Sequence, residues 1–383
     1  MTAVESPTDL LATARRLSPL VVEHAAEGER RGTMPEPVVD AFAAAGLFGL
    51  MLPRELGGAE ADLRTVLGVF EELSRADGST GWSLLANATT SAFAGAYCGD
   101  EAVAAMFSPG TPAIHAGMLG PVGECRATEG GFVVHGRFRF GSGSGHASWL
   151  GGGAFEDRDG ETAVSASGLP VMRVFFVPRD RVEFLGNWDV MGLVATGSFD
   201  YDIPEQVVPE AFTFSLLEPE VRRGGPLYRL GVLGLTSAGH AAFALGVGRR
   251  AIEELVGVAR TKQRLASGPL AENPLLHHDL GFHDAALRSA RAYVYEVFGA
   301  AQDALDAGRE PTMVEHQRLR QATTYATKVA ADVVRGCYEW AGTDALRPSP
   351  LQRCFRDIHA GTQHLFVDPS TISASGQLLL AEV

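Results

Sequence analysis

Cysteine and positive charge are both scarce in this 383-residue sequence. The four cysteines lie far apart without CxxC spacing, which argues against a disulfide scaffold and against a zinc motif. Because 46 acidic residues outnumber 32 lysines and arginines, the formal net charge of −14 disfavours nucleic acid and anionic membrane surfaces as partners. The N-terminus lacks the apolar core of a signal peptide. We therefore expect a cytoplasmic protein with free thiols.

Two further patterns that would indicate other classes of protein are missing or weak. No GxGxxG fingerprint is present, so we do not expect a nicotinamide dinucleotide to bind this chain. Residues 230–248 run for 19 positions without a charged side chain, which is close to the length of a membrane span. Five glycines, Thr236, Ser237 and His240 lower the hydrophobicity of this segment. We predict a buried helix in a globular core and no membrane contact.

Hydrophobic periodicity predicts three structural units. Residues 1–111 contain apolar stripes at helical spacing, which predicts an N-terminal α-helical domain, and Thr33 and Glu36 have the spacing of a helix-opening capping box. Residues 112–215 are rich in glycine and proline and include an alternating segment, GFVVHGRFRFGSG, which predicts a central β domain. In that strand we expect one face to carry Phe132, Val134, Phe138 and Phe140. Two long apolar stripes within residues 216–383 predict a C-terminal helical bundle.

Five motifs occur in a particular order along the chain. They are LPRELGG (52–58), DGSTGW (77–82), GRFRFGSGSGHASW (136–149), WDVMGLVATGS (188–198) and RDIHAGTQH (356–364). Together they make the sequence resemble the acyl-CoA dehydrogenase superfamily over nearly its whole length. The resemblance implies an α+β fold with an N-terminal α-helical domain, a central β-barrel or sandwich domain, and a C-terminal four-helix bundle.

The sequence departs from the dehydrogenases of this superfamily at the catalytic base. Residues 358–367, which follow the Arg-Asp pair, contain no acid, and Leu365 stands where most members have glutamate. The alternative position also fails, because residues 221–252 contain neither aspartate nor glutamate. Around His364 the chain resembles instead the oxygenase components of two-component flavin-dependent monooxygenases. An imidazole with a pKa of about 6.5 could act there as a base or as a hydroperoxide stabiliser.

The resemblance also implies where a flavin would bind. Ser142 would offer its hydroxyl to the central ring nitrogen, Phe140 would pack against the ring, and Lys262 and Arg264 would reach the flavin phosphate, often that of a neighbouring subunit. We accordingly predict His364 and Ser142 as catalytic residues, with Phe140, Ser142, Lys262 and Arg264 binding the cofactor. The cluster LLHHDLGFHD (275–284) is interpreted as a solvated helix face, and we predict no metal site.

The leading functional hypothesis is the oxygenase component of a two-component monooxygenase. It would use reduced FMN or FAD from a partner flavin reductase, with O2 as co-substrate, to oxygenate a small aromatic or heteroatom-containing molecule. An elongated α-helical bundle of this apolar character predicts a homotetramer built as paired dimers, in which the flavin site would be shared between subunits. Two alternatives stay open: an acyl-CoA dehydrogenase with a relocated base such as Glu218 or Glu220, and a non-catalytic scaffold.

Overall fold

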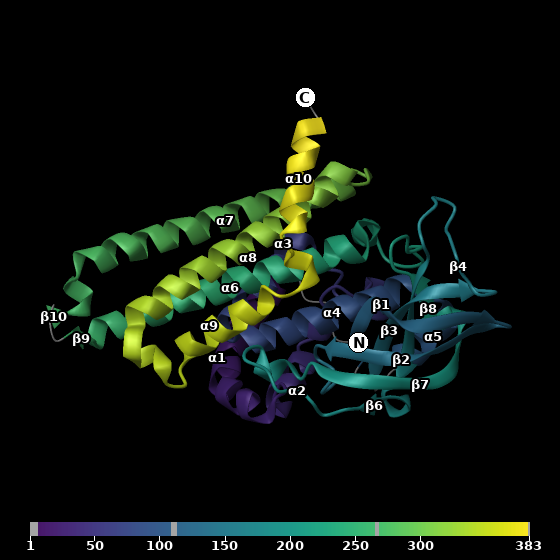
Figure 1. The fold of residues 1–383 in the computed structure, drawn as a ribbon, viewed down its shortest axis with the longest axis horizontal. Coiled ribbons are helices and arrows are strands. Elements are labelled where there is room, and N and C mark those ends of the chain that lie inside the picture. The colour runs from purple at the N-terminus through teal and green to yellow at the C-terminus, as the bar shows by residue number, and fades with distance from the viewer. Residues whose placement is uncertain (1–6, 109–112, 265–267, 382–383) are drawn as a thin grey trace.

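Along the chain, helices precede and follow a central β domain in the computed structural model, which describes residues 7–108, 113–264 and 268–381. In space the sheet lies at one end of the molecule, and the long helices extend away from it (Figure 1). The N-terminal region contains α1 (Pro7–Arg31), α2 (Glu36–Ala44), α3 (Leu63–Ala76), α4 (Gly78–Tyr97) and α5 (Asp100–Met106). The C-terminal region contains α6 (Gly231–Thr261), α7 (Pro274–Asp306), α8 (Met313–Ala341), α9 (Pro350–Gly361) and α10 (Ser370–Ala381). The predicted α, β, α order is confirmed. The predicted boundary between residues 111 and 112 lies outside the described residues.

The β domain is built on one mixed sheet. Its strands are β1 (His115–Thr128), β2 (Gly131–Gly141), β3 (Trp149–Arg158), β4 (Glu161–Thr162), β5 (Met172–Pro178), β6 (Glu183–Phe184), β7 (Phe199–Pro209) and β8 (Thr213–Ser215). The strand order is β6-β7-β2-β1-β3-β5-β8, with β4 paired to β3. Strands β1 and β3 are parallel and the other pairs are antiparallel. The sheet contacts helix α4 through β1.

The alternation predicted for β2 holds along most of the strand and then fails at Phe140. Phe132, Val134 and Phe138 are buried, whereas Phe140 is 60% exposed and has a φ of +62°. The pairing of β2 with β7 shifts register between Phe138 and Gly141. Such a bulge inserts extra residues into one strand and re-aims a side chain. Phe140 therefore leaves the core, and the expectation that it shares the buried face was wrong.

The C-terminal bundle consists of α6 to α9, which pack with their apolar stripes inward. Helix α8 begins with a complete capping box made by Thr312 and Glu315, and Gly342 caps its end with a positive φ. The segment 226–261 is long and apolar enough for a membrane span, but 83% of its most apolar stretch is buried inside the protein. It is a core helix of the bundle, as predicted.

The cap predicted at Thr33 and Glu36 was wrong. Helix α2 begins after Pro35, which has no side-chain oxygen to offer, and the Thr33 hydroxyl is buried without a hydrogen-bond partner among the described residues. The proline shifts the start of the helix because its fixed φ suits a position at the helix entrance. Thr33 instead lies against Gly145 and Gly197, at the edge of the region where the motifs meet.

Candidate functional site

The end of β2 meets the first turns of α4, and this brings Ser142 against Trp82. Asp77 caps the start of helix α4, and its side chain accepts a hydrogen bond from the Thr80 backbone N–H at 2.9 Å. One turn later, the Trp82 Nε1–H donates to Ser142 Oγ at 3.0 Å. Ser142 is half-buried, so part of its surface faces the outside of this junction.

Three hydroxyl groups form a continuous chain that starts at Ser142. Its oxygen lies 2.8 Å from Ser198 Oγ, which in turn lies 2.6 Å from Thr196 Oγ1. The Thr196 hydroxyl donates to the Leu193 carbonyl at 2.7 Å. Ser198, Thr196 and Leu193 belong to the WDVMGLVATGS motif between β6 and β7. The hydroxyl chain therefore joins this motif to the serine that follows β2.

The loop that carries Thr196 and Ser198 is held in place by α9. Leu193 has a left-handed φ of +56°, which is costly for a residue with a side chain, and its backbone N–H donates to Asp357 Oδ1 at 2.6 Å. The neighbouring Arg356 donates through Nη1 to the Met191 carbonyl at 3.0 Å. The Arg-Asp pair of the last motif therefore fixes the loop behind Ser142.

Asp357 and Asp77 are two buried carboxyl groups at the back of this loop. Burial raises the pKa of Asp357 to about 7, with a further contribution from the charge of Asp77. Burial likewise raises the pKa of Asp77, although Arg353, whose Nε lies 3.8 Å from Asp77 Oδ1, opposes this. Two carboxyl groups in one dry site favour a state in which at least one is protonated.

His364 also packs against Trp82, through ring contacts rather than through a hydrogen bond. The ring centroids of His364 and Trp82 are 5.5 Å apart, and those of His364 and His240 are 4.2 Å apart. Burial lowers the pKa of His364 to about 4. Its Nδ1 accepts from the Phe366 backbone N–H at 3.3 Å, which places the proton of the neutral ring on Nε2. His364 is therefore a neutral hydrogen-bond donor at pH 7 and a poor base.

The exposed Phe140 and the half-buried Trp188 form an aromatic pair next to this junction. Their ring centroids lie 6.3 Å apart in an edge arrangement. Asp200 holds the strained backbone of Phe140 by accepting from its N–H at 3.2 Å. A strained residue that exposes a large aromatic ring is a common feature of binding sites. An exposed aromatic wall beside a half-buried hydroxyl fits a planar ring system with hydrogen-bonding nitrogens, such as a flavin.

Lys262 and Arg264 do not join this group of residues within one chain. They follow the end of α6 beside β9 (Gln263–Arg264) and β10 (Gly268–Pro269), at the opposite end of the bundle from the sheet (Figure 1). Lys262 Nζ donates to the Ala341 carbonyl at 2.6 Å, and Arg264 donates to the Trp340 carbonyl at 3.0 Å. The predicted phosphate contact therefore requires these residues to come from a second copy of the chain.

The carboxylates considered for a dehydrogenase lie elsewhere. Glu218 and Glu220 are both exposed, and Glu220 pairs with Arg222 at 2.7 Å. The hydrogen-bond partners of Ser142 and His364 within the described residues include no carboxylate. In that same part of the chain no cluster of three or more His, Cys, Asp or Glu side chains could hold a metal ion.

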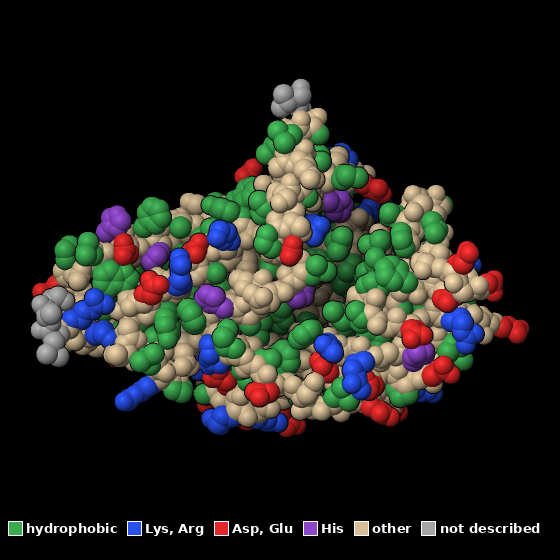
Figure 2. All heavy atoms as spheres, viewed as in Figure 1, with side chains coloured by type: hydrophobic (Ala, Val, Ile, Leu, Met, Phe, Trp, Pro, Cys, Tyr) green, Lys and Arg blue, Asp and Glu red, His purple; other side chains and the backbone are tan. Residues whose placement is uncertain are grey.

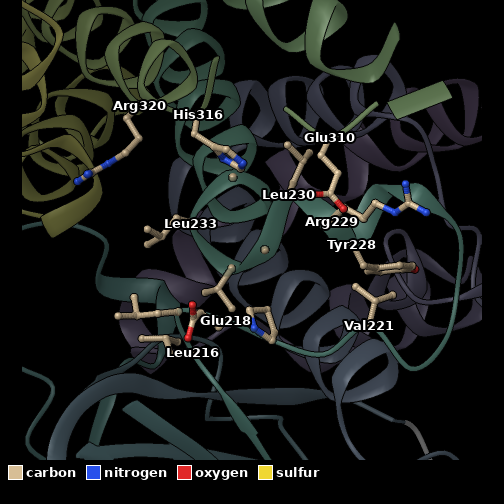
Figure 3. A pocket seen from close by; sticks show the side chains of 15 residues that line it. Leu216, Glu218, Val221, Tyr228, Arg229, Leu230, Leu233, Glu310, His316 and Arg320 are labelled. Carbon is tan, nitrogen blue, oxygen red and sulfur yellow. The ribbon is translucent and has the colours of Figure 1, made fainter. Parts of the chain in front are cut away.

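A cavity of about 440 Å³ opens where the chain passes from β8 into α6. Figure 2 shows the molecule hollowed between α10 and the β domain, with hydrophobic side chains around the hollow. In Figure 3 the His316 ring points into the cavity, and Glu310 and Arg229 both line it. Arg320 also lines the cavity, and its Nε is buried without a hydrogen-bond partner among the described residues. The cavity thus combines apolar walls with several polar groups.

Several residues of the site were not predicted. Ser198, Thr196 and Trp82 all stand inside the recognised motifs, but no role in the site was predicted for them. His240 gave one signal, as a lone imidazole in the apolar run of 230–248, and it is buried against His364. A buried polar side chain without an evident partner in the sequence is the pattern that could have identified it.

Comparison with known proteins agrees with this geometry. Residues 6–111 match the family model "Acyl-CoA dehydrogenase, N-terminal domain", and residues 238–369 match "Acyl-CoA dehydrogenase, C-terminal domain". The chain is 31% identical to an indole-3-acetate monooxygenase of Pseudomonas putida, over 93% of this chain and 90% of that protein. It is 27% identical to the flavin-dependent monooxygenase oxygenase subunit HsaA of Rhodococcus jostii, over 92% of this chain and 93% of that protein.

Solved structures share the fold. The HsaA monooxygenase of Mycobacterium tuberculosis superimposes with a TM-score of 0.89 at 23% identity, covering 98% of both chains. XiaF from Streptomyces sp., solved with FADH2 and glycerol, superimposes with a TM-score of 0.87 at 23% identity, covering 98% of this chain and 96% of its own. The chain belongs to the acyl-CoA dehydrogenase superfamily, in the branch that contains the oxygenase components of flavin-dependent monooxygenases.

Proposed function

We propose that this protein uses reduced FMN or FAD, delivered by a separate flavin reductase, and O2 to oxygenate a small aromatic molecule. When bound, the reduced flavin supplies the two electrons needed to activate O2, so that one oxygen atom can pass to the substrate and the other can leave as water. The observation that carries the proposal is the junction of Ser142, Trp82 and His364, in which a hydroxyl and a neutral imidazole contact the same indole ring.

The roles of the individual residues follow from their surroundings. Phe140 and Trp188 would form the wall against the flavin ring, and Ser142 would contact its central nitrogen. His364 would act as a hydrogen-bond donor through Nε2–H rather than as a base, because burial lowers its pKa to about 4. The aromatic rings of Trp82, His240 and Phe366 around His364 would receive an aromatic substrate by stacking and edge contacts.

Relatives support an aromatic substrate by their names, which include indole-3-acetate monooxygenase and a resorcinol hydroxylase component. We place the polar end of such a substrate in the cavity beside α6, whose lining includes Arg320. The positive charge of a guanidinium at the cavity wall would favour a carboxylate or phenolate oxygen there.

We also propose a homotetramer in the cytoplasm. In Figure 1, β9 lies at the opposite end of the bundle from the β domain that carries Ser142, and a neighbouring subunit would supply Lys262 and Arg264 to the flavin phosphate. Exposed apolar side chains on α7 and α10, namely Leu275, Phe282, Leu379 and Leu380, support contact with other copies. All four cysteines are free and buried, as expected in a reducing compartment.

The test is a single-turnover reaction under controlled oxygen. Purified protein is mixed with anaerobically reduced FMN or FAD and one of indole, indole-3-acetate or resorcinol, and isotopically heavy O2 is added. The expected result is a product that contains one heavy oxygen atom, formed much less by His364→Ala and Ser142→Ala. If every substrate yields hydrogen peroxide only, and an acyl-CoA bleaches the bound oxidised flavin, the dehydrogenase alternative replaces this proposal.

A further inference from the structure

The direction of the hydroxyl chain behind Ser142 can be worked out from the number of protons available. A carbonyl oxygen can only accept, so the 2.7 Å contact between Thr196 Oγ1 and the Leu193 carbonyl must contain the Thr196 hydroxyl proton. That hydroxyl has no second proton to give. The 2.6 Å contact between Thr196 and Ser198 must then contain the proton of Ser198.

The same reasoning assigns the donor and the acceptor in each remaining hydrogen bond of the chain. Because Ser198 has given its proton to Thr196, the 2.8 Å contact between Ser142 and Ser198 must contain the proton of Ser142. Trp82 Nε1–H is a donor only, so it occupies one lone pair of Ser142. All the hydrogen bonds therefore run one way, from Trp82 through Ser142, Ser198 and Thr196 to the Leu193 carbonyl. A chain oriented in this way also strengthens each of its members.

Ser142 consequently has one hydrogen-bonding capacity left, a lone pair. Ser142 is half-buried and stands two residues after the exposed Phe140, so a flavin ring packed against Phe140 would meet this lone pair. A reduced flavin carries an N–H at its central ring nitrogen and can donate to this lone pair. An oxidised flavin presents a lone pair at the same nitrogen, and two acceptors that face each other in a partly dry site repel one another.

We propose that the oriented chain through Ser198 and Thr196 makes Ser142 an obligate acceptor, so that the site selects reduced over oxidised flavin. This inference rests on the proposed flavin site at Ser142. Ser198 and Thr196 are positioning residues, since they act on the flavin only by fixing the proton of Ser142. Asp357 supports them by holding Leu193 in its left-handed conformation.

The test compares dissociation constants for oxidised and for anaerobically reduced FMN and FAD, measured by equilibrium ultrafiltration without turnover. The wild-type protein is expected to bind the reduced form more tightly. In Ser198→Ala the Ser142 proton is free to turn toward the flavin, so the preference is expected to fall by roughly three- to tenfold, the equivalent of one net hydrogen bond. Thr196→Val, which keeps the buried side-chain volume, is expected to shift the ratio in the same direction.

Ser144→Ala is the matched control. Ser144 lies two residues from Ser142 and is buried, but its hydroxyl donates to the Gly197 carbonyl at 2.9 Å and stands outside the chain. In Ser144→Ala the ratio of the dissociation constants for oxidised and reduced flavin is expected to equal that of the wild type. For each variant the dissociation constant for oxidised flavin is divided by that for reduced flavin. A general loss of stability weakens the binding of both flavin forms alike, so it cancels in this ratio.

Two results would overturn the inference, and they differ from each other. If flavin binds but neither Ser198→Ala nor Thr196→Val changes the ratio by more than about twofold, the oriented chain does not control the flavin, while the proposed function stands. If the wild-type protein binds neither oxidised nor reduced flavin, the proposed function fails and this inference fails with it.

Discussion

Replacement of Asp357 by asparagine is expected to make the protein more stable at alkaline pH. Asp357 is 3% exposed, and burial together with Asp77 raises its pKa from 3.8 to about 7. The folded state therefore holds this proton more tightly than the unfolded state does. Its contribution to stability is full below about pH 4 and is lost as the pH rises to about 7.

The magnitude follows from the size of this shift. A rise of about three pKa units corresponds to about 4 kcal/mol at roughly 1.4 kcal/mol per unit, so the wild-type protein loses up to that amount between about pH 4 and about pH 7. Asparagine keeps the acceptor for the Leu193 N–H, because its Oδ1 can take the place of the carboxylate oxygen. It carries no charge to repel Asp77. The stability of Asp357→Asn relative to the wild type should therefore increase as the pH rises.

The assay is thermal unfolding of the flavin-free protein from about pH 5 to about pH 8 at constant ionic strength. The midpoints of the two proteins are expected to lie close together at the acid end and to separate in favour of Asp357→Asn at the alkaline end. Asp332→Asn is the control, because Asp332 is exposed on α8 and should leave the pH dependence unchanged. A constant gap across the pH range, or a variant that loses stability faster than the wild type, would refute the reasoning.

Three other outcomes are expected. Phe140→Gly should raise the free energy of unfolding of the flavin-free protein by about 1 kcal/mol, since it relieves a left-handed φ at an exposed residue, and it should weaken flavin binding in a titration. Trp82→Phe keeps the ring against His364 but removes the donor to Ser142, and should increase the ratio of hydrogen peroxide to product. Arg320→Gln should raise KM for indole-3-acetate about tenfold and leave KM for indole unchanged; an equal rise for both would remove the proposed role of the cavity.

The order of helices and strands could be predicted because its causes are local. Helical stripes and the capped start of α4 depend on residues a few positions apart, and these patterns survive in the fold. The prediction of the face that carries Phe140 failed, because pairing with a distant strand changes the local alternation. The bulge that turns Phe140 outward comes from pairing with β7, which lies far along the chain and which the alternation of β2 does not report.

The candidate site was predictable only as a set of residue types. Residue order alone shows that a histidine stands near the position where dehydrogenases have glutamate, that a serine follows β2, and that an Arg-Asp pair precedes the histidine. It does not show that Trp82 joins Ser142 to His364, that His240 packs on His364, or that the hydroxyl chain has one direction, because these follow from packing. Hydrogen-bond direction and the pKa of a buried group depend on which atoms packing brings within about 3 Å, and the order of residues along the chain does not specify that.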